Sequence, residues 1–299
     1  MTFNSQLHSS KQSQAQQESF FKNINYFILK NYKPKLQLNA TEVSVNNVTN
    51  RTLFFDPKGI AYSNRQNKIH YEGMKGTYIQ RRGILHISKK VKMKMEENSS
   101  SLVAKEVIYN LNMGRIDARG DVKSKSISKM NGDKILVNSD RAISWTRRNE
   151  TKYFGNVNGK VVRKRVYESP ILYRSNKLHL KMNQHLINLE GDVVIKKQTF
   201  TARSRRGKLY LENYNKRLKY FALYDDVKVV EKVKLGRSVF LRKAFAEQLD
   251  GIVSEGKMVL TGYPKVYQQG DEIKGNKIIL RENNDVVEVE DANSTFKSN

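Results

Sequence analysis

The sequence predicts an elongated all-β protein, a single antiparallel sheet built from repeated hairpins, with a short helix near the N-terminus. Gly-Asp-Val-like triplets recur at nearly constant spacing. Those at Gly120, Gly155 and Gly191 are 35 and 36 residues apart, and related triplets follow at Asp225 and Gly262, 34 and 37 residues further on. A repeat of roughly 20–50 residues is typical of stacked arrays, whose units bury each other's apolar faces. We therefore expect each hairpin to close on such a triplet, and function to reside in a long surface or groove.

Composition supports this class and indicates an anionic partner. Val, Ile, Tyr, Phe and Thr are frequent and only 4 of the 299 residues are proline, which favours strands. The 55 lysines and arginines exceed the 29 acidic residues and give a net charge of +26. Such charge favours nucleic acid, a membrane surface or a phosphorylated or carboxylated ligand, or forms a solvated basic face. The chain has no cysteine, which excludes disulfides and thiolate metal sites.

The N-terminal part is predicted to differ from the rest. Residues 1–18 are rich in Ser, Gln and Asn and are expected to be disordered. In residues 19–33, apolar side chains at Phe20, Ile24, Phe27 and Ile28 share one side of a short amphipathic helix that ends before Pro34. This helix could cap the open end of the array or dock on a membrane surface. No signal peptide or membrane span is visible in the sequence.

From about residue 34 onward, the apolar residues alternate as in strands. In the segment 90–95, lysines occupy one face while Val91, Met93 and Met95 occupy the other. Val107 to Gly120, Leu178 to Gly191 and Ile278 to Asp291 each span 13 residues, which indicates one shared hairpin geometry. An expanded turn is expected around 147–150 and a tight turn at 158–159. About fourteen or more strands should form one sheet that curls into a trough or flattened barrel.

The stretch 258–280 carries a resemblance to a known family. It reads Met-Val-Leu-Thr-Gly-Tyr-Pro-Lys-Val-Tyr-Gln-Gln-Gly-Asp-Glu-Ile-Lys-Gly-Asn-Lys-Ile-Ile-Leu, and 283–289 continue it. The L-x-G corner, the Gln, the Gly-Asp and the final I-x-G-N-x-I resemble the OstA-like family of lipopolysaccharide-transport proteins. The segments 104–122 and 175–193 resemble looser repeats of the same superfamily, which includes lipopolysaccharide-transport protein C. We accordingly divide the chain into C-like repeats over 34–200 and OstA-like repeats over 201–299 in one sheet.

This resemblance implies a β-jellyroll, or β-taco, that belongs to a bridge across the periplasm. Lipopolysaccharide or a similar anionic lipid would move from the inner to the outer membrane with its acyl chains in an apolar trough. The partners implied are other bridge proteins, joined by edge-strand addition, and further copies of this chain joined head to tail through the acidic segment 285–291. The resemblance implies no cofactor, metal or enzymatic activity.

The strand alternation gives a set of inward residues that could contact lipid or could simply fill a closed core. The set is Val91, Met93, Val107, Ile116, Val122, Ile135, Val157, Leu178, Leu180, Leu189, Val193, Leu209, Leu211, Val227, Met258, Leu260, Val266, Ile278 and Leu280.

Clustered basic residues are the candidates for binding anionic head groups, because the planar guanidinium group binds two phosphate oxygens at once. They are Arg147, Arg148, Arg163, Lys164, Arg165, Arg203, Arg205 and Arg206. Trp145, two residues before Arg147, could anchor a partner or lie buried.

Other functions find less support in the sequence. The five histidines are scattered, and no nucleophile elbow, phosphate loop or metal-binding spacing occurs. An enzyme is therefore not expected. A structural scaffold of the cell envelope that uses the same array without a ligand is one alternative. A non-specific polyanion or nucleic-acid binder is another. Nucleic acid is not the expected partner, because the sequence contains no recognisable nucleic-acid-binding module.

Overall fold

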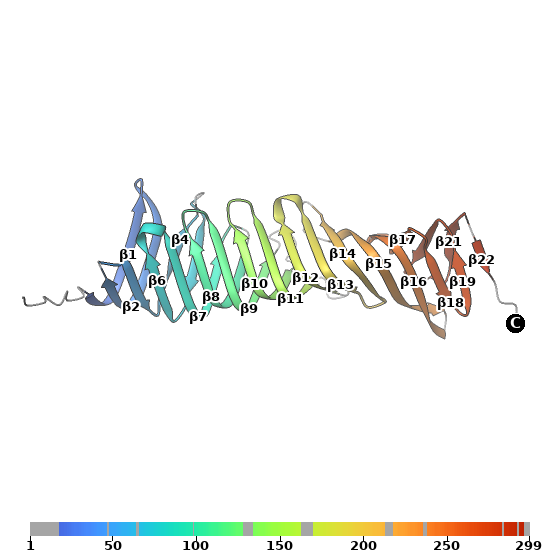
Figure 1. The fold of residues 1–299 in the computed structure, drawn as a ribbon, viewed down its shortest axis with the longest axis horizontal. Helices are drawn as coiled ribbons and strands as arrows, with labels where there is room; N and C mark the ends of the chain where they lie inside the picture. Colours follow the sequence, from blue (N-terminus) through green and yellow to red (C-terminus); the bar gives the residue numbers. More distant parts are fainter. Residues whose placement is uncertain are drawn as a thin grey trace, which may run out of the picture.

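The computed structural model describes residues 18–46, 48–63, 66–97, 99–127, 134–162, 170–212, 218–235, 238–282, 284–291 and 293–295. Within these ranges the chain forms one antiparallel sheet of 22 strands. Figure 1 shows a long rod in which the strands follow one another broadly in chain order, from β1 at one end to β22 at the other. The predicted all-β class and elongated jellyroll are confirmed.

The strands in the middle of the rod are all long, whereas those nearer its two ends vary in length. The first six are β1 (Glu18–Lys30), β2 (Lys33–Asn46), β3 (Arg51–Phe55), β4 (Lys58–Tyr62), β5 (Lys68–Glu72) and β6 (Lys75–Ile79). The middle nine are β7 (Ile84–Met95), β8 (Ser100–Asn110), β9 (Arg115–Ile127), β10 (Lys134–Trp145), β11 (Glu150–Val162), β12 (Ile171–Lys181), β13 (Leu186–Lys196), β14 (Phe200–Leu211) and β15 (Leu218–Leu235). The last seven are β16 (Ser238–Ile252), β17 (Lys257–Thr261), β18 (Lys265–Gln268), β19 (Asp271–Lys274), β20 (Lys277–Arg281), β21 (Val287–Glu290) and β22 (Asn293–Thr295). Single 3-10 turns, η1 (Gln80–Arg82) and η2 (Met182–Gln184), precede β7 and β13.

The predicted N-terminal helix is wrong, because this segment is strand β1, paired with β2 in a hairpin. A local irregularity explains the misleading pattern. Asn23 has a φ of 52°, and neither it nor Thr41 on the facing strand takes a partner in the register, which is the same on both sides of them. The alternation of faces is interrupted there, so Phe21, opposite Val43, and Ile24, opposite Ala40, fall on one face at a spacing that resembles a helix. Residues 1–17 of the predicted disordered segment lie outside the described ranges.

The triplets at Gly120, Gly155, Gly191 and Asp225 lie in the middle of long strands and not at the expected hairpin ends, and the triplet at Gly262 lies between β17 and β18. In β9, both Gly120 and Asp121 have positive φ, 73° and 48°, and the same double left-handed conformation occurs in β7, β11, β13 and β15. The register with neighbouring strands shifts at these points, as expected for bulges that bend a strand. The bends align into a line along the rod, which we call the crease.

The crease divides the sheet into two facing walls. In β9, residues 115–119 belong to the first wall and residues 122–127 to the second. Side chains on neighbouring strands pair along the outside of the crease: Lys105 Nζ lies 2.7 Å from an Asp121 carboxylate oxygen, and the Asn176 side-chain amide donates to Asp192 at 2.9 Å. Glycine is favoured at this bend of β9 because a Cβ on Gly120, besides its positive φ, would lie 2.9 Å from the Lys105 side chain, whereas β7 and β15 have Lys89 and Asp225 at the corresponding position.

Two local turn predictions have different outcomes. The turn between β10 and β11 occupies residues 146–149, close to the expected position. The tight turn expected at 158–159 is wrong, because both residues lie inside β11. Gly159 faces inward there, and the ring of Tyr173 from β12 fills the space that a side chain would need. Among the described residues, no helix is long and apolar enough to cross a membrane.

Candidate functional site

The space between the two walls is lined by apolar side chains along the length of the rod. All the predicted inward residues are buried in a single hydrophobic cluster that runs from Leu36 in β2 to Leu280 in β20, and none of them is more than 6% exposed. The sequence alternation therefore identified the inner face correctly. Whether these residues contact a lipid stays a prediction.

The interior is packed rather than hollow over most of its length. A cavity between the walls, bordered by β5 and β7 to β12, has a volume of about 70 Å³. A hydrogen bond spans the walls beside it, since the Tyr153 hydroxyl from the first wall lies 2.8 Å from Ser124 Oγ of the second. A cavity of this size holds only a few water-sized groups. An acyl chain could enter only if the walls moved apart.

Two tyrosine hydroxyls are buried inside without a hydrogen-bond partner in the described part of the chain. They belong to Tyr109 in β8 and Tyr173 in β12. Burial raises the pKa of Tyr109 to about 12, although the charge of Arg147 opposes the shift. Burial also raises the pKa of Tyr173, and neighbouring Tyr153 adds to the shift. Both phenols therefore stay neutral and present unsatisfied polar groups to the interior.

The open side of the trough lies opposite the crease, where the hairpin turns form two rows that we call lips. The first lip contains the turns 111–114, 146–149, 182–185 and 253–256, linked by backbone hydrogen bonds such as Thr146 N to Gly114 O at 2.9 Å. The second lip contains the turn between β4 and β5 and the turn 197–199, and Lys232 N donates to Thr199 O at 2.9 Å within it.

The lining of the cavity combines polar and apolar side chains. Hydroxyl and amide groups contribute together with half-buried Trp145: Ser63, Asn67, Ser100, Ser126, Ser144, Thr146, Asn149 and Thr151. Apolar side chains lie beside them on neighbouring strands, where Ile135 pairs with Ser126 and Leu180 with Thr151: Ile69, Met95, Leu102, Ile135, Val137 and Leu180. Charged Lys68, Glu97 and Lys125 complete the lining. The Lys152 ammonium lies 5.8 Å from the centroid of the Trp145 ring. A mixed lining of this kind could accept an amphiphile.

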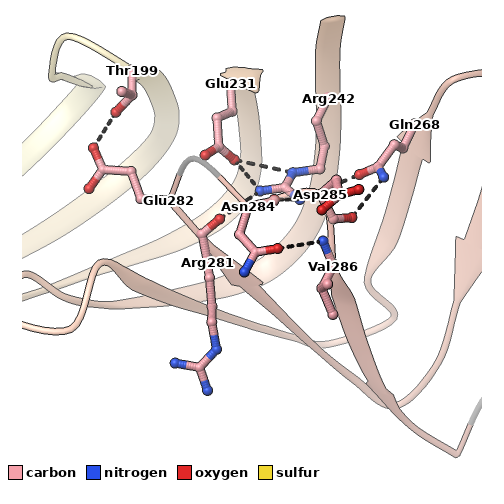
Figure 2. A network of polar contacts seen from close by, with 9 residues as sticks. All are labelled: Thr199, Glu231, Arg242, Gln268, Arg281, Glu282, Asn284, Asp285 and Val286. Carbon is pink, nitrogen blue, oxygen red and sulfur yellow. Dashed lines mark hydrogen bonds and ion pairs between the residues drawn. The ribbon is translucent and has the colours of Figure 1, made fainter. Parts of the chain in front are cut away.

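Near the C-terminal end, a buried ion pair ties the two lips together (Figure 2). Arg242 of β16 and Glu231 of β15 are paired at 2.7 Å with side chains 0% and 1% exposed. The same guanidinium donates across the trough to the backbone oxygens of Arg281 at 3.0 Å and Asn284 at 2.8 Å. A buried charge pair needs such additional hydrogen bonds to offset its desolvation. We call this network, together with the contacts of Glu282, the clasp.

Glu282 makes the second connection between the lips. Its carboxylate, on the first lip, accepts a hydrogen bond from Lys197 Nζ at 2.6 Å and another from the hydroxyl of Thr199, both on the second lip. Sequence reasoning missed the clasp, yet a signal was present. Val227, Val229, Glu231 and Val233 alternate in β15, so the acid stands at an inward position where an apolar residue is expected.

The predicted anion-binding residues do not form one cluster. Arg147 and Arg148 lie in a turn of the first lip, whereas Arg203 lies on the outer face of the second wall. Arg205 and Arg206 flank the crease and pair with Asp226 and Asp225, each at 2.5 Å. The other three, Arg163, Lys164 and Arg165, lie outside the described residues. Among the described residues, no group of three or more His, Asp, Glu or Cys side chains could hold a metal ion.

Comparisons with known proteins agree with this architecture. Residues 2–144 match the family model described as "Lipopolysaccharide-assembly, LptC-related", and residues 174–286 match "LptA/(LptD N-terminal domain) LPS transport protein". Among curated proteins, the search found no match.

One similar solved structure is that of LptH from Pseudomonas aeruginosa, described as the LptA homologous periplasmic component of the lipopolysaccharide transport device. Its sequence is 17% identical, and the match covers 43% of this chain and 96% of that chain with a TM-score of 0.39. A score of this size supports no argument about function. The two family models, which together span most of the chain and meet in one continuous sheet, show that the chain belongs to the OstA-like superfamily of lipopolysaccharide-transport proteins.

Proposed function

We propose that this protein is a periplasmic bridge component that carries lipopolysaccharide from the inner to the outer membrane, with the acyl chains held between its two walls. The observation that carries the proposal is the single cluster of buried apolar side chains that extends from β2 to β20. Each buried methylene gains about 0.8 kcal/mol relative to water. A continuous row of such contacts would let acyl chains advance without entering solvent.

Lipid entry requires the walls to separate, since the cavity of about 70 Å³ is far too small for several acyl chains. Chains that replace the contacts between walls would lie against the same inward residues. Leu180 is well placed for this role because it lies in the cavity wall and is 6% exposed. The buried hydroxyls of Tyr109 and Tyr173 would face the polar groups of the lipid.

Edge strands offer a way to join neighbouring bridge proteins. Within the described residues, the outer edge of β1 pairs with no strand over residues 18–30, and at the other end β21 pairs only with β20. Unpaired backbone groups along an edge are templates for strand addition. Addition at both ends would make the trough continuous with that of a neighbour or of a second copy.

Native mass spectrometry with purified lipid A tests the proposal directly. The chain should retain or bind lipid A, and displacement by unlabelled lipid should be complete. A Leu180→Trp variant should then keep its fold, measured by circular dichroism, while its capacity for lipid falls. The absence of any lipid adduct for the unaltered chain would contradict the proposal.

The filled interior favours one competing function, a scaffold that holds envelope proteins without a ligand. Under that alternative, Leu180→Trp would only reduce stability and would leave assembly with partners unchanged. The two functions therefore differ in whether this variant changes lipid binding while its fold is unchanged.

A further inference from the structure

Four basic side chains converge over the mouth of the trough, and the fold brings them from distant parts of the chain. Lys30, Lys33 and Lys35 come from the β1–β2 hairpin, whose tip stands on the side of the second lip. Arg147 comes from the β10–β11 turn of the first lip. All four line one hollow of about 350 Å³, together with Asn31, Gln66 and Asn112.

The hollow carries a concentration of positive charge. Among the described residues that line it, none is acidic, and Lys30, Lys33 and Arg147 make no ion pair within the described part of the chain. The pKa of Lys35 is lowered by burial and further by the charges of Lys30 and Arg147. Like charges held this close repel each other, so a bound anion would relieve the repulsion.

One of these cations is fixed in position by the lip. Arg147 Nη2 donates to the backbone oxygen of Asn112 in the neighbouring turn at 2.7 Å. The remaining guanidinium nitrogens stay available toward the hollow, and a planar guanidinium matches the geometry of two phosphate oxygens. The lysines on the opposite side add mobile point charges that can follow a phosphate group.

The hollow adjoins the cavity described above. Gln66 and Arg147 line the hollow, while the adjacent residues Asn67 and Thr146 line the cavity. The cations of the hollow thus lie next to a cavity whose lining combines hydroxyl, amide and apolar side chains. This juxtaposition suits an amphiphile that has a phosphorylated head, a polar sugar region and acyl chains.

We propose that this hollow binds the phosphate groups of a phosphorylated glycolipid while its acyl chains enter the trough beneath, and that Lys30, Lys33, Lys35 and Arg147 make the contacts. The inference rests on the proposed function and adds the place at which the head group is held. It also gives the β1–β2 hairpin a role in binding, because three of the four basic residues lie near its tip.

Titration with lipid A tests this inference, with fluorescence of Trp145 as the readout because it is the only tryptophan of the chain and lies in the cavity wall. The unaltered chain should bind bisphosphorylated lipid A about tenfold more tightly than enzymatically dephosphorylated lipid A. The double variant Lys33→Gln/Arg147→Gln should lose this preference and keep its affinity for the dephosphorylated lipid.

A matched control removes the same charge elsewhere. Arg174→Gln/Lys228→Gln alters one arginine and one lysine that are exposed on the outer face of the second wall, so it should keep the preference for phosphate. Equal loss in the control, or full preference in the mouth variant, would overturn the inference while leaving lipid binding intact. Circular dichroism of both variants should match that of the unaltered chain.

Inorganic pyrophosphate distinguishes a lipid head group from a free anion. It should bind at least about a hundredfold more weakly than bisphosphorylated lipid A, because it gains nothing from the apolar trough. Binding of pyrophosphate as tightly as the lipid would overturn the head-group assignment. If the unaltered chain binds neither form of lipid A, the proposed function itself fails, which is a different outcome from loss of the phosphate preference.

Discussion

Two inward tyrosines of similar burial differ in one hydrogen bond, and this difference has a measurable consequence. The hydroxyl of Tyr173 has no partner in the described part of the chain, whereas that of Tyr153 is bonded to Ser124. An unpaired buried polar group is unfavourable by about 1–3 kcal/mol, and its removal can stabilise a protein.

We expect Tyr173→Phe to raise the free energy of unfolding by about 1 kcal/mol and Tyr153→Phe to lower it by about the same amount. Urea denaturation followed by circular dichroism measures both. Equal destabilisation by the two variants would contradict this account of the interior.

Asp117 on β9 is a buried carboxylate whose titration should be visible in stability. Burial alone would raise its pKa, but hydrogen bonds from Arg141 and Arg119 outweigh burial and lower the pKa below its ordinary value of 3.8. The closest contact, to Arg141 Nη2, is 2.6 Å. Because the folded state favours the charged form, its contribution is present above about pH 4 and is lost as the pH falls below that value.

The variant Asp117→Asn should therefore be less stable than the unaltered chain by about 1–2 kcal/mol at pH 7, a modest figure because the arginines are partly exposed. The difference should shrink as the pH falls below about 4. Thermal unfolding from pH 7 to pH 3 measures it, and a difference that stays constant over this range would argue against the ion pair.

At the scale of the element, three of the bends that form the crease, in β9, β11 and β13, begin with a glycine. Gly191 of β13 has a φ of 74°, and a Cβ there would lie 2.7 Å from the side-chain nitrogen of Asn176. We expect Gly191→Ala to destabilise the fold by about 1–3 kcal/mol. The adjacent Asp192→Asn should change stability by less than about 0.5 kcal/mol, since asparagine also adopts positive φ and can still accept the bond from Asn176.

The ratio of these two effects is the test, and chemical denaturation of both variants measures it. A loss at Asp192→Asn as large as that at Gly191→Ala would show that the polar pair, rather than the backbone conformation, maintains the bend.

The sequence predicted the middle of the sheet better than its ends. In β7 to β15 the two-residue alternation is regular enough to identify which side chains face inward, so Val107, Leu178 and Leu209 were all placed correctly. At β1, the left-handed residue Asn23 interrupted the alternation, and the resulting spacing imitated that of a helix. The triplets marked real features, but a double positive φ in a strand and a tight turn draw on the same residues, Gly, Asn and Asp.

The sequence pattern could not predict those features of the site that join distant strands. Glu231 and Arg242 break the apolar alternation at inward positions, which indicates a buried contact but not its partner. That Lys33 stands near Arg147 depends on how the two walls face each other, and periodicity along the chain carries no information about that.

At the scale of the whole molecule, the clasp predicts that passage of lipid requires the lips to part. Joining Thr199→Cys to Glu282→Cys with a short bismaleimide would hold the lips closed, and no native cysteine competes because the chain has none. Transfer of lipid A from the loaded chain to an acceptor should then fall by at least about tenfold. A fluorescent lipid A and acceptor vesicles provide the measurement.

The control joins two residues of the same lip, Thr199→Cys and Lys232→Cys, whose backbones are already hydrogen bonded at 2.9 Å. This crosslink should leave transfer unchanged. Equal inhibition by both crosslinks would mean that modification of Thr199 itself, and not closure of the mouth, slows the lipid.

The crease gives every second long strand from β7 to β15 a pivot of its own. Two left-handed residues form each pivot in β7, β9, β11, β13 and β15, so a few neighbouring strands can swing outward while those ahead and behind remain shut. We therefore expect a lipid to move along the rod inside a local opening between the walls that travels with it, while the rest of the rod stays closed.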